Sequence, residues 1–292
     1  MQGIILRGIG GFYTAMDEAG EMHILRAQRK LRRDRVKPKV GDRVEMQPGT
    51  GEEDGWILSI LPRENELVRP PVANIDVIVI VAAAATPEPD MLLLERMILT
   101  ARRRGIRPML VITKCELNPE GAQRIIRQYR GAQVNAMAVS AHTGENIDAL
   151  REALRGSVHA LAGQSGAGKS SLINALYRME LETGSLSEKI DRGKNTTRAS
   201  ELIPLEGGGM VLDTPGFSLL DGELFDPVEL QDSYPEFEPH LGKCYFQPCY
   251  HATEPKCSVL QAVKDDEIDS ERHGRYVELL NEMKIKWRER YD

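Results

Sequence analysis

The sequence predicts a multidomain α/β protein, with a small β-barrel of the OB type first, a mostly parallel sheet next, and a metal-binding helical segment last. Three observations lead to this prediction. Strand-like runs separated by turn residues fill the N-terminal part, buried apolar runs alternate with helical patterns from Ile75, and three of the four cysteines lie between Cys244 and Cys257. At 292 residues the chain fits two or three domains, which we expect at 1–69, 70–220 and 221–292.

The N-terminal domain is expected to contain five short strands. Glycine-containing turns separate the strand-like runs, which lie at residues 4–8, 12–16, 22–27, 43–47 and 56–61. Five strands in so short a stretch are typical of a small closed barrel of the OB type, which we interpret as an RNA-binding domain.

The charge of the chain is unevenly distributed. Residues 26–43 carry nine Lys or Arg and two Asp, whereas residues 218–292 have a net charge of −8, so the overall −6 conceals a strongly basic stretch. Residues 29–39 show neither helical nor strand periodicity and are expected to form a loop. Such a loop can simply be solvated, but its excess positive charge favours contact with a nucleic-acid phosphate backbone.

Composition places the chain among ordinary globular proteins. Hydrophobic residues make up 41% and charged residues 28% of the sequence, and no apolar stretch has the length of a membrane span. The N-terminus also lacks the residue order of a secretory signal, so a cytoplasmic location is expected.

The central domain is expected to be a parallel sheet covered by helices on both faces, because buried strands alternate with helical segments. The strands are expected at 75–83, 108–113, 134–140, 157–162 and 210–213, and the helices at 91–104, 120–130, 147–154 and 171–177. A nucleotide is expected at the carboxyl ends of these strands. Two further helices are expected at 258–268 and 271–290.

A phosphate-binding loop follows one of these strands. Residues 163–170 fit the pattern GxxxxGKS at every fixed position, between a short buried strand and a helix. Glycines allow backbone N–H groups to converge on phosphate oxygens, Lys169 can reach the outer phosphates, and Ser170 can ligate Mg²⁺. A glycine-rich turn that binds nothing is the alternative, but such a turn seldom needs the lysine.

Two later segments have the features of nucleotide-sensing switches. Asp213 ends a strand and begins the sequence DTPG, which places a carboxylate toward Mg²⁺ and the N–H of Gly216 toward a γ-phosphate. The polar segment 191–198 lacks periodicity and contains Thr196 and Thr197. We favour Thr197 as the Mg²⁺ ligand, with Thr196 as the alternative.

Two strand ends resemble the guanine-reading motifs NKxD and SAK. Thr113-Lys114-Cys115-Glu116 closes one strand and Ser140-Ala141 closes the next. The Glu116 carboxylate can accept from guanine N1–H and N2–H₂, which adenine does not offer, and the Ala141 N–H can meet O6. Thr113 and Glu116 depart from the Asn and Asp of the motif, which makes guanine selectivity less secure than phosphate binding.

The cysteine cluster is expected to bind a metal. Cys244, Cys249, His251 and Cys257 supply three thiolates and one imidazole, a closed tetrahedral set suited to one structural Zn²⁺. The absence of an export signal makes disulfides a poorer explanation. Cys115 lies outside the cluster and is interpreted as a small apolar side chain near the base.

The order of these motifs is inverted relative to an ordinary GTP-binding domain, because the base-reading elements precede the P-loop. The chain therefore resembles the circularly permuted GTPases and, with its barrel and cysteine cluster, the ribosome small-subunit-dependent GTPase A family (RsgA/YjeQ/YloQ). The resemblance implies a monomer that contacts 16S-type rRNA and hydrolyses GTP when stimulated by the small (30S) ribosomal subunit during late maturation. It also implies that hydrolysis is coupled to release from the subunit.

The resemblance and the motifs together define the expected site. Catalytic roles are expected for Lys169, Thr197 and Gly216, and the Mg²⁺ shell is expected from Ser170, Thr197 and Asp213. GTP or GDP is expected to contact Thr113, Lys114, Glu116, Ser140, Ala141, Gly163, Gln164, Ser165, Gly166, Ala167, Gly168, Lys169, Ser170, Ser171, Thr196, Thr197 and Asp213.

Two residues leave alternatives open. Phe217 stands where Ras-like enzymes carry a water-orienting glutamine, and Asn195 stands where this family often has a histidine. Intrinsic turnover is therefore expected to be slow and partner-dependent. The alternatives are a nucleotide-gated rRNA-binding clamp with incidental hydrolysis, or an ATPase. Because the chain runs from residue 217 directly into the C-terminal domain, we also hypothesise that this domain follows the nucleotide state.

Overall fold

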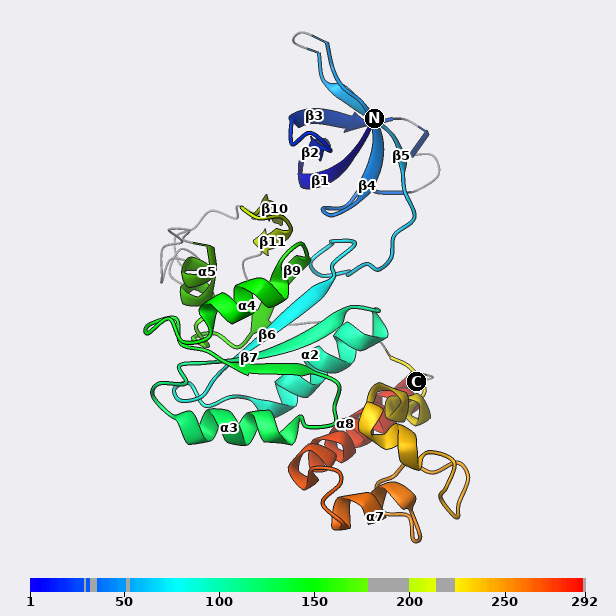
Figure 1. The fold of residues 1–292 in the computed structure, drawn as a ribbon. Helices are drawn as coiled ribbons and strands as arrows, with labels where there is room; N and C mark the ends of the chain where they lie inside the picture. The colour runs from blue at the N-terminus through cyan, green and yellow to red at the C-terminus, as the bar shows by residue number, and fades with distance from the viewer. Residues whose placement is uncertain (29, 32–35, 51–52, 178–199, 214–223, 291–292) are drawn as a thin grey trace, which may run out of the picture.

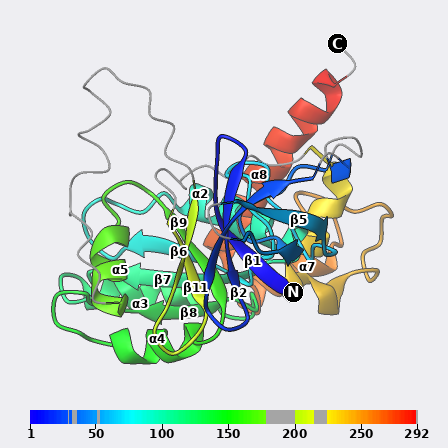
Figure 2. The same cartoon turned by 90° about the horizontal axis from the view of Figure 1, so that it is seen from above.

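The computed structural model describes residues 1–28, 30–31, 36–50, 53–177, 200–213 and 224–290 (Figure 1). A barrel at the N-terminus is followed by a central sheet with helices, and the C-terminal helices lie against the opposite end of that central unit. Figure 2 shows the same arrangement from above. No helix in these ranges is long and apolar enough to span a membrane.

The N-terminal strands close into a five-stranded barrel. They are β1 (Gln2–Ile9), β2 (Phe12–Asp17), β3 (Met22–Ala27), β4 (Arg43–Gln47) and β5 (Gly55–Ile60). β1 pairs with both β2 and β4, and the ring is completed by β2–β3, by β4–β5 and by a parallel β3–β5 pairing. The predicted OB-type barrel is confirmed, with strand ends within two residues of the expected ones.

Alternation of side chains produces the barrel core. In β3, Leu25 and Ala27 point inward and are buried, whereas Ile24 and Arg26 are exposed. The interior contains Ile5, Ala15, Leu25, Ala27, Leu31, Val44, Met46 and Ile57.

A buried ion pair attaches the barrel to the linker that follows it. Arg63 donates from Nε to Asp42 Oδ1 (2.7 Å) and from Nη2 to Asp42 Oδ2 (2.9 Å), and the Asp42 side chain is fully buried. Arg63 also contacts Glu66, which accepts a hydrogen bond from Lys39 Nζ at 2.9 Å. Lys39, the last residue of the predicted basic loop, is therefore paired with the linker through its ammonium group.

In the described ranges, the sheet continues from the barrel into a central part of six strands, in the order β10-β11-β9-β6-β7-β8. β6 (Val77–Ala83), β7 (Arg107–Thr113), β8 (Asn135–Ala138), β9 (Val158–Gly163) and β11 (Met210–Asp213) are parallel, as predicted. β10 (Glu201–Pro204) is an antiparallel strand that the sequence analysis missed. It also pairs with β1 of the barrel through Arg7 and Glu201.

Helices cover both faces of this sheet, which confirms the expectation from the alternating pattern. α2 (Met91–Arg103) and α3 (Pro119–Gln128) pack on one face, where the core includes Ile78 and Ile80 of β6. α4 (Ile147–Leu154) and α5 (Lys169–Tyr177) pack on the other face, over Val77 and Val79. Successive residues of β6 thus face opposite layers, as the strand period requires.

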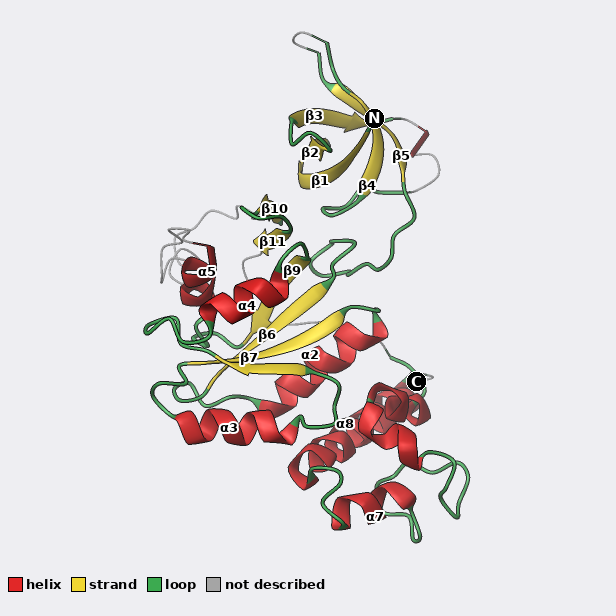
Figure 3. Ribbon diagram, viewed as in Figure 1, coloured by secondary structure: helices red, strands yellow, loops and turns green. Residues whose placement is uncertain are grey.

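The C-terminal segment is helical (Figure 3). Its described residues, 224–290, form the 3₁₀ helices η2 (Pro227–Ser233) and η3 (Pro235–His240) and the α-helices α7 (Ser258–Lys264) and α8 (Ser270–Glu289). Its core gathers Phe237 and Tyr276, whose rings meet edge to face at 4.8 Å. Glu95 of α2 accepts from Arg272 and Arg275 of α8, each at 3.2 Å, which joins this segment to the central unit.

A buried histidine lies in β9, directly before the P-loop. His159 Nε2 lies 2.5 Å from the Tyr177 hydroxyl at the end of α5, and the imidazole is fully buried. Burial lowers the pKa of His159 to about 4, so the ring is neutral in the folded chain at neutral pH.

We expect this histidine to make stability fall as the medium becomes acidic. The unfolded chain binds a proton on His159 below about pH 6.5, whereas the folded chain resists protonation down to about pH 4. The contribution of neutral His159 to the free energy of unfolding is therefore complete above pH 6.5 and is lost as the pH falls from 6.5 to 4. His159→Gln should remove this pH dependence, which amounts to up to about 3 kcal/mol in the free energy of unfolding. Urea unfolding at several pH values measures this, and an unchanged pH profile would contradict it.

Replacing Arg63 with alanine is expected to lower the free energy of unfolding by about 1.5–3 kcal/mol, because Asp42 stays buried while losing two charge-assisted hydrogen bonds. Urea unfolding followed by Trp56 fluorescence in a Trp287→Phe background reports on the barrel. Arg43→Ala is the control, since Arg43 and Glu64 form an exposed pair whose loss should cost less than about 1 kcal/mol. Equal effects of the two variants would show that the buried pair has no special role.

Candidate nucleotide-binding and zinc sites

The P-loop has a backbone that only glycine fits easily. β9 ends at Gly163 and α5 begins at Lys169, and the connecting turn has positive φ at Gly163 (144°), Gly166 (75°) and Gly168 (92°). A Cβ on Gly163 would lie 2.2 Å from the Val81 carbonyl oxygen. The strand, loop and helix context predicted for GxxxxGKS is therefore present, with the loop at the carboxyl end of the sheet.

Lys169 lies across this loop. Its Nζ donates to the carbonyl oxygens of Gly163 (2.7 Å) and Gln164 (2.8 Å), and burial lowers the pKa of its ammonium group. The charge is thus held over the concave turn, where phosphate oxygens would meet it. Ser165, Ser170 and Ser171 lie in the turn and in the first turn of α5.

The first predicted base-reading segment, residues 113–116, is tied directly to the P-loop. The buried Thr113 hydroxyl donates to the Ala167 carbonyl oxygen at 2.5 Å and lies 3.2 Å from that of Ala82. Lys114 Nζ donates to the carbonyl oxygens of Gly166 (3.0 Å) and Thr86 (2.5 Å). Two motifs separated by about fifty residues therefore share one hydrogen-bonded unit.

The second predicted base-reading segment, Ser140 and Ala141, lies beside the first. The Cys115 N–H donates to the Val139 carbonyl oxygen at 3.4 Å, directly before Ser140. Ser140 is fully buried, and its hydroxyl accepts from the Thr143 N–H at 3.0 Å, which shapes the turn that carries Ala141.

Glu116 carries an unsatisfied acceptor in this region. Its Oε2 atom is buried and has no hydrogen-bond partner among the described residues. A buried carboxylate oxygen without a donor is costly, so the position fits a ligand that brings N–H groups, as the Watson–Crick edge of guanine does. The residues present therefore fit a guanine nucleotide.

Asp213 reaches the same edge of the sheet. It ends β11, which runs parallel to β9 with Leu212 opposite Ala160, so its carboxylate lies at the end of the strand next to the P-loop strand. Thr196, Thr197, Gly216, Phe217 and Asn195 lie outside the described residues. The structure thus brings together the P-loop, both predicted base-reading segments and Asp213.

The loop between β6 and α2 is a neighbour of the P-loop that the sequence analysis missed. Besides the Thr86 contact with Lys114, the N–H of Asp90 donates to Gln164 Oε1 at 3.2 Å, and Asn118 Nδ2 donates to the Ala84 carbonyl oxygen at 2.9 Å. The sequence could have indicated this, because the loop follows a central parallel strand and loops in that position line the ligand crevice.

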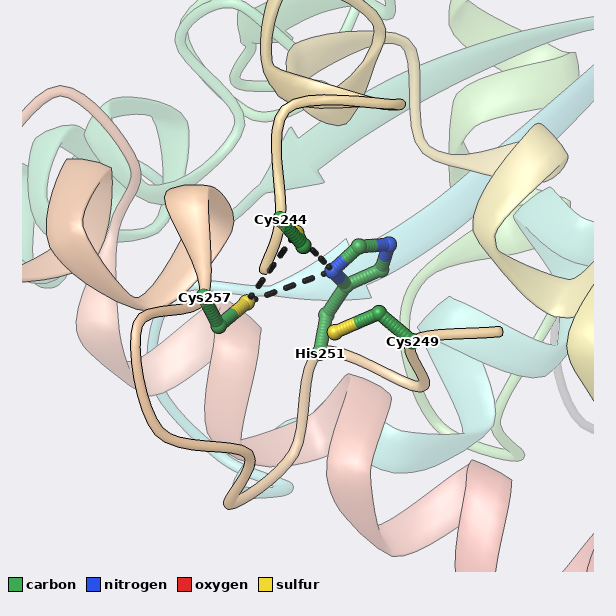
Figure 4. Close-up of side chains that lie close together, drawn as sticks. All are labelled: Cys244, Cys249, His251 and Cys257. Carbon is green, nitrogen blue, oxygen red and sulfur yellow. Dashed lines mark hydrogen bonds between the residues drawn. The ribbon is translucent and has the colours of Figure 1, made fainter. Parts of the chain in front are cut away.

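The four predicted metal ligands converge in the C-terminal segment (Figure 4). Their donor atoms all lie within 4.8 Å of one another. Cys244 Sγ is 3.7 Å from Cys257 Sγ and 3.6 Å from His251 Nδ1, which is 3.3 Å from Cys257 Sγ. Tetrahedral Zn²⁺, with bonds of about 2.0–2.3 Å, requires ligand separations of about 3.3–3.8 Å. The three separations fall in this range, so the donor set fits zinc.

Neighbouring groups orient these ligands. Gln231 Oε1 lies 2.6 Å from His251 Nε2, which leaves Nδ1 to face the sulfurs, and the N–H groups of Ser258 and Leu260 donate to Cys244 Sγ and Cys257 Sγ. Burial raises the pKa of the Cys249 thiol to about 12, so this thiol ionises only when a cation compensates its charge. Gln231 could not be identified from the sequence, because it lies outside the segment 244–257 that holds the four predicted ligands.

A second group, Asp17, Glu21 and His23, also lies close together in the barrel. The oxygens of Asp17 are already used, since Oδ1 accepts from the N–H groups of Ala19 and Glu21 and Oδ2 lies 2.8 Å from His23 Nε2. This cluster is explained by its turn and ion pair.

Cys249→Ser is expected to lower bound zinc from about one ion per chain to well below half, because it removes one of four ligands. Metal analysis of purified protein and loss of helical circular dichroism after chelation measure this. Cys115→Ala is the matched control, since Cys115 is buried near Glu145, remote in sequence from the cluster. Full zinc occupancy in Cys249→Ser would contradict the assignment.

Comparisons with known proteins agree with this geometry. Residues 2–57 match the family model described as RsgA N-terminal domain, and residues 60–223 match RsgA GTPase. Proteins named small ribosomal subunit biogenesis GTPase RsgA are similar to this chain. The relative from Caldanaerobacter subterraneus is 43% identical over 100% of this chain and 98% of its own length, and that from Halalkalibacterium halodurans is 40% identical over 99% of each.

Two solved structures share the complete architecture. YjeQ from Thermotoga maritima superposes with a TM-score of 0.82 at 32% identity, covering 97% of this chain and 98% of that one. YloQ, described as a circularly permuted GTPase, superposes with a TM-score of 0.80 at 31% identity, covering 98% and 95%.

Proposed function

The chain belongs to the RsgA GTPase family, and we propose that it hydrolyses GTP on the small ribosomal subunit during the biogenesis of that subunit. The observation that carries the proposal is the hydrogen-bonded unit of the P-loop with Thr113 and Lys114. It supports a single site where phosphate-binding and base-reading residues act on one nucleotide.

The phosphate end of the nucleotide would be held by backbone N–H groups of residues 163–168 and by Lys169. Mg²⁺, when bound, would neutralise charge developing on the phosphate oxygens. Ser170 and Asp213 are at the edge of the sheet where they would hold this ion. Thr197, or Thr196, is proposed as a further ligand, and the Gly216 N–H as a γ-phosphate donor.

The base end would be read by Glu116 and Ala141. The unpartnered Glu116 oxygen supports acceptance from guanine N1–H and N2–H₂, and adenine presents no donor pair there. This difference favours GTP over ATP, because an unpaired buried carboxylate is penalised.

Ribosomal RNA is the proposed partner of the basic stretch in the barrel. Lys30 and Lys37 are exposed, and the arginines at 29, 32, 33 and 35 lie outside the described residues. Lys39 of the same stretch is paired with Glu66. We further propose that the chain binds one structural Zn²⁺ and that the protein is a cytoplasmic monomer. Its proposed domains are 1–69, 70–220 and 221–292.

Glu116→Gln tests the base-reading role. The amide replaces an acceptor by a donor, so affinity for GDP should fall about 10- to 100-fold, whereas affinity for the xanthine nucleotide, which presents a carbonyl at C2, should rise. Fluorescent-nucleotide titration measures both. Glu145→Gln, a nearby exposed carboxylate, should leave both affinities unchanged. Parallel weakening of both nucleotides by Glu116→Gln would contradict direct reading of the base.

Multiple-turnover GTP hydrolysis with and without purified small subunits tests the function itself. Turnover should be slow alone and strongly stimulated by the subunit, and ATP should not compete with GTP. Lys169→Ala should bind nucleotide weakly and show no stimulated turnover, since it loses the cation over the P-loop. Tight subunit binding without stimulation would instead support a nucleotide-gated clamp.

A further inference from the structure

The helix that begins at the P-loop buries few of its side chains. α5 has nine residues, Lys169–Tyr177, of which only Leu172 and Leu176 are buried. Its carboxyl end also borders a cavity of about 360 Å³, whose lining includes Leu154, Leu176 and Tyr177. Empty space gives a side chain no packing partner, so apolar contacts alone support this end of the helix poorly. Its position therefore depends on polar contacts.

One polar contact joins the end of α5 to β9. The Tyr177 hydroxyl lies 2.5 Å from His159 Nε2, and the other ring nitrogen, Nδ1, lies 3.3 Å from both the hydroxyl and the carbonyl oxygen of Ser157. The Ser157 hydroxyl already donates to the Leu154 carbonyl oxygen at 2.7 Å. Since the low pKa of His159 keeps the ring neutral, Nδ1 carries the proton and Nε2 accepts from Tyr177.

A second polar contact joins the same end of α5 to α4, which lies beside it (Figure 1). Arg151 donates from Nε to the Leu176 carbonyl oxygen at 2.7 Å and from Nη2 to the Ala175 carbonyl oxygen at 3.2 Å. The last carbonyl groups of a helix have no partner within it, and the guanidinium group supplies the missing donors. Arg151, His159 and Tyr177 thus hold this end of α5 from two neighbouring elements, and we call them the α5 clamp.

The opposite end of α5 carries the proposed Mg²⁺ ligand. A helix of this length is a rod of about 13 Å, so a shift at Tyr177 tilts the first turn, where Ser170 lies. The turn before the helix has its own support, because the Thr113 hydroxyl binds the Ala167 carbonyl oxygen. Loss of the clamp should therefore disturb Ser170 more than the phosphate-binding turn.

We propose that Arg151, His159 and Tyr177 are positioning residues, which orient α5 so that the Ser170 hydroxyl can ligate the Mg²⁺ of a bound nucleotide. They act through the helix, from the end opposite to the phosphates. Groups that orient a metal ligand change metal affinity by about 10- to 100-fold when they are removed. The inference rests on the proposed function, because it takes Ser170 as a ligand of Mg²⁺.

Binding of a fluorescent GDP derivative to the full chain, with Mg²⁺ or with excess EDTA, tests the proposal. Tyr177→Phe keeps the ring and loses the hydroxyl, so the gain in GDP affinity that Mg²⁺ produces should fall about tenfold. Affinity in EDTA should be unchanged, because the phosphate-binding turn is held separately. His159→Gln offers an amide oxygen in place of Nε2, so it should retain most of the Mg²⁺ effect.

Arg151→Met provides the second arm, since it removes the donors to α5 and keeps the apolar stem. It should also lower the Mg²⁺ effect about tenfold without changing affinity in EDTA. Arg155→Ala is the matched control at the end of α4, because Arg155 forms an exposed pair with Glu152, and it should behave as the wild type does. Arg63→Ala in the barrel controls for lost stability, and circular dichroism reports whether each variant is folded.

An unchanged Mg²⁺ effect in folded Tyr177→Phe or Arg151→Met would overturn the proposal. Equal weakening of GDP binding with Mg²⁺ and with EDTA would also overturn it, because the clamp would then support the whole phosphate site. The same loss of the Mg²⁺ effect in Arg63→Ala would assign it to stability and overturn the positioning role. If the wild-type chain binds no GDP, the proposed function fails, and the positioning role fails with it.

Discussion

The hydrogen bond from Thr113 to the Ala167 carbonyl oxygen is the interaction on which the nucleotide site depends. It joins the end of β7 to the P-loop after β9, and Lys114 adds a second link to the same loop. Parallel strands place all their carboxyl ends at one edge, so the order of the strands along the chain can change without moving the site. Inversion of the motif order is therefore compatible with one nucleotide pocket.

α2 connects this pocket to the C-terminal segment that carries the cysteine cluster. It begins at Asp90, whose N–H meets Gln164 of the P-loop, and its Glu95 binds two arginines of α8. Buried charges are costly unless paired, so this contact fixes a specific arrangement more than it adds stability. Five buried polar atoms near it have no partner among the described residues: Gln128 Oε1, Tyr129 OH, Tyr234 OH, Glu236 Oε2 and Arg275 Nη2. An interface with several buried polar atoms that lack hydrogen-bond partners can rearrange. The hypothesised movement of the C-terminal domain with nucleotide state would therefore occur at this interface.

Local patterns predicted most of this structure, and long-range pairing explains what they missed. The P-loop and the four metal ligands were identifiable because spacing within a short segment defines their chemistry. β10 was missed because it has only four residues and ends at Pro204, so its composition does not indicate a strand. Its backbone pairing with β11 makes it one. The ion pair of Lys39 was not predicted because its partner, Glu66, lies on the linker beyond the barrel strands. Gln231 likewise meets His251 only through the fold.

The central claim is that elements scrambled along the chain surround one guanine nucleotide. A crystal structure of the chain with GDP and Mg²⁺ tests it most directly. The account predicts the base within hydrogen-bonding distance of the Glu116 carboxylate while the β-phosphate of the same molecule lies in the turn of residues 163–168. A base bound away from Glu116, or phosphates outside that turn, would contradict it.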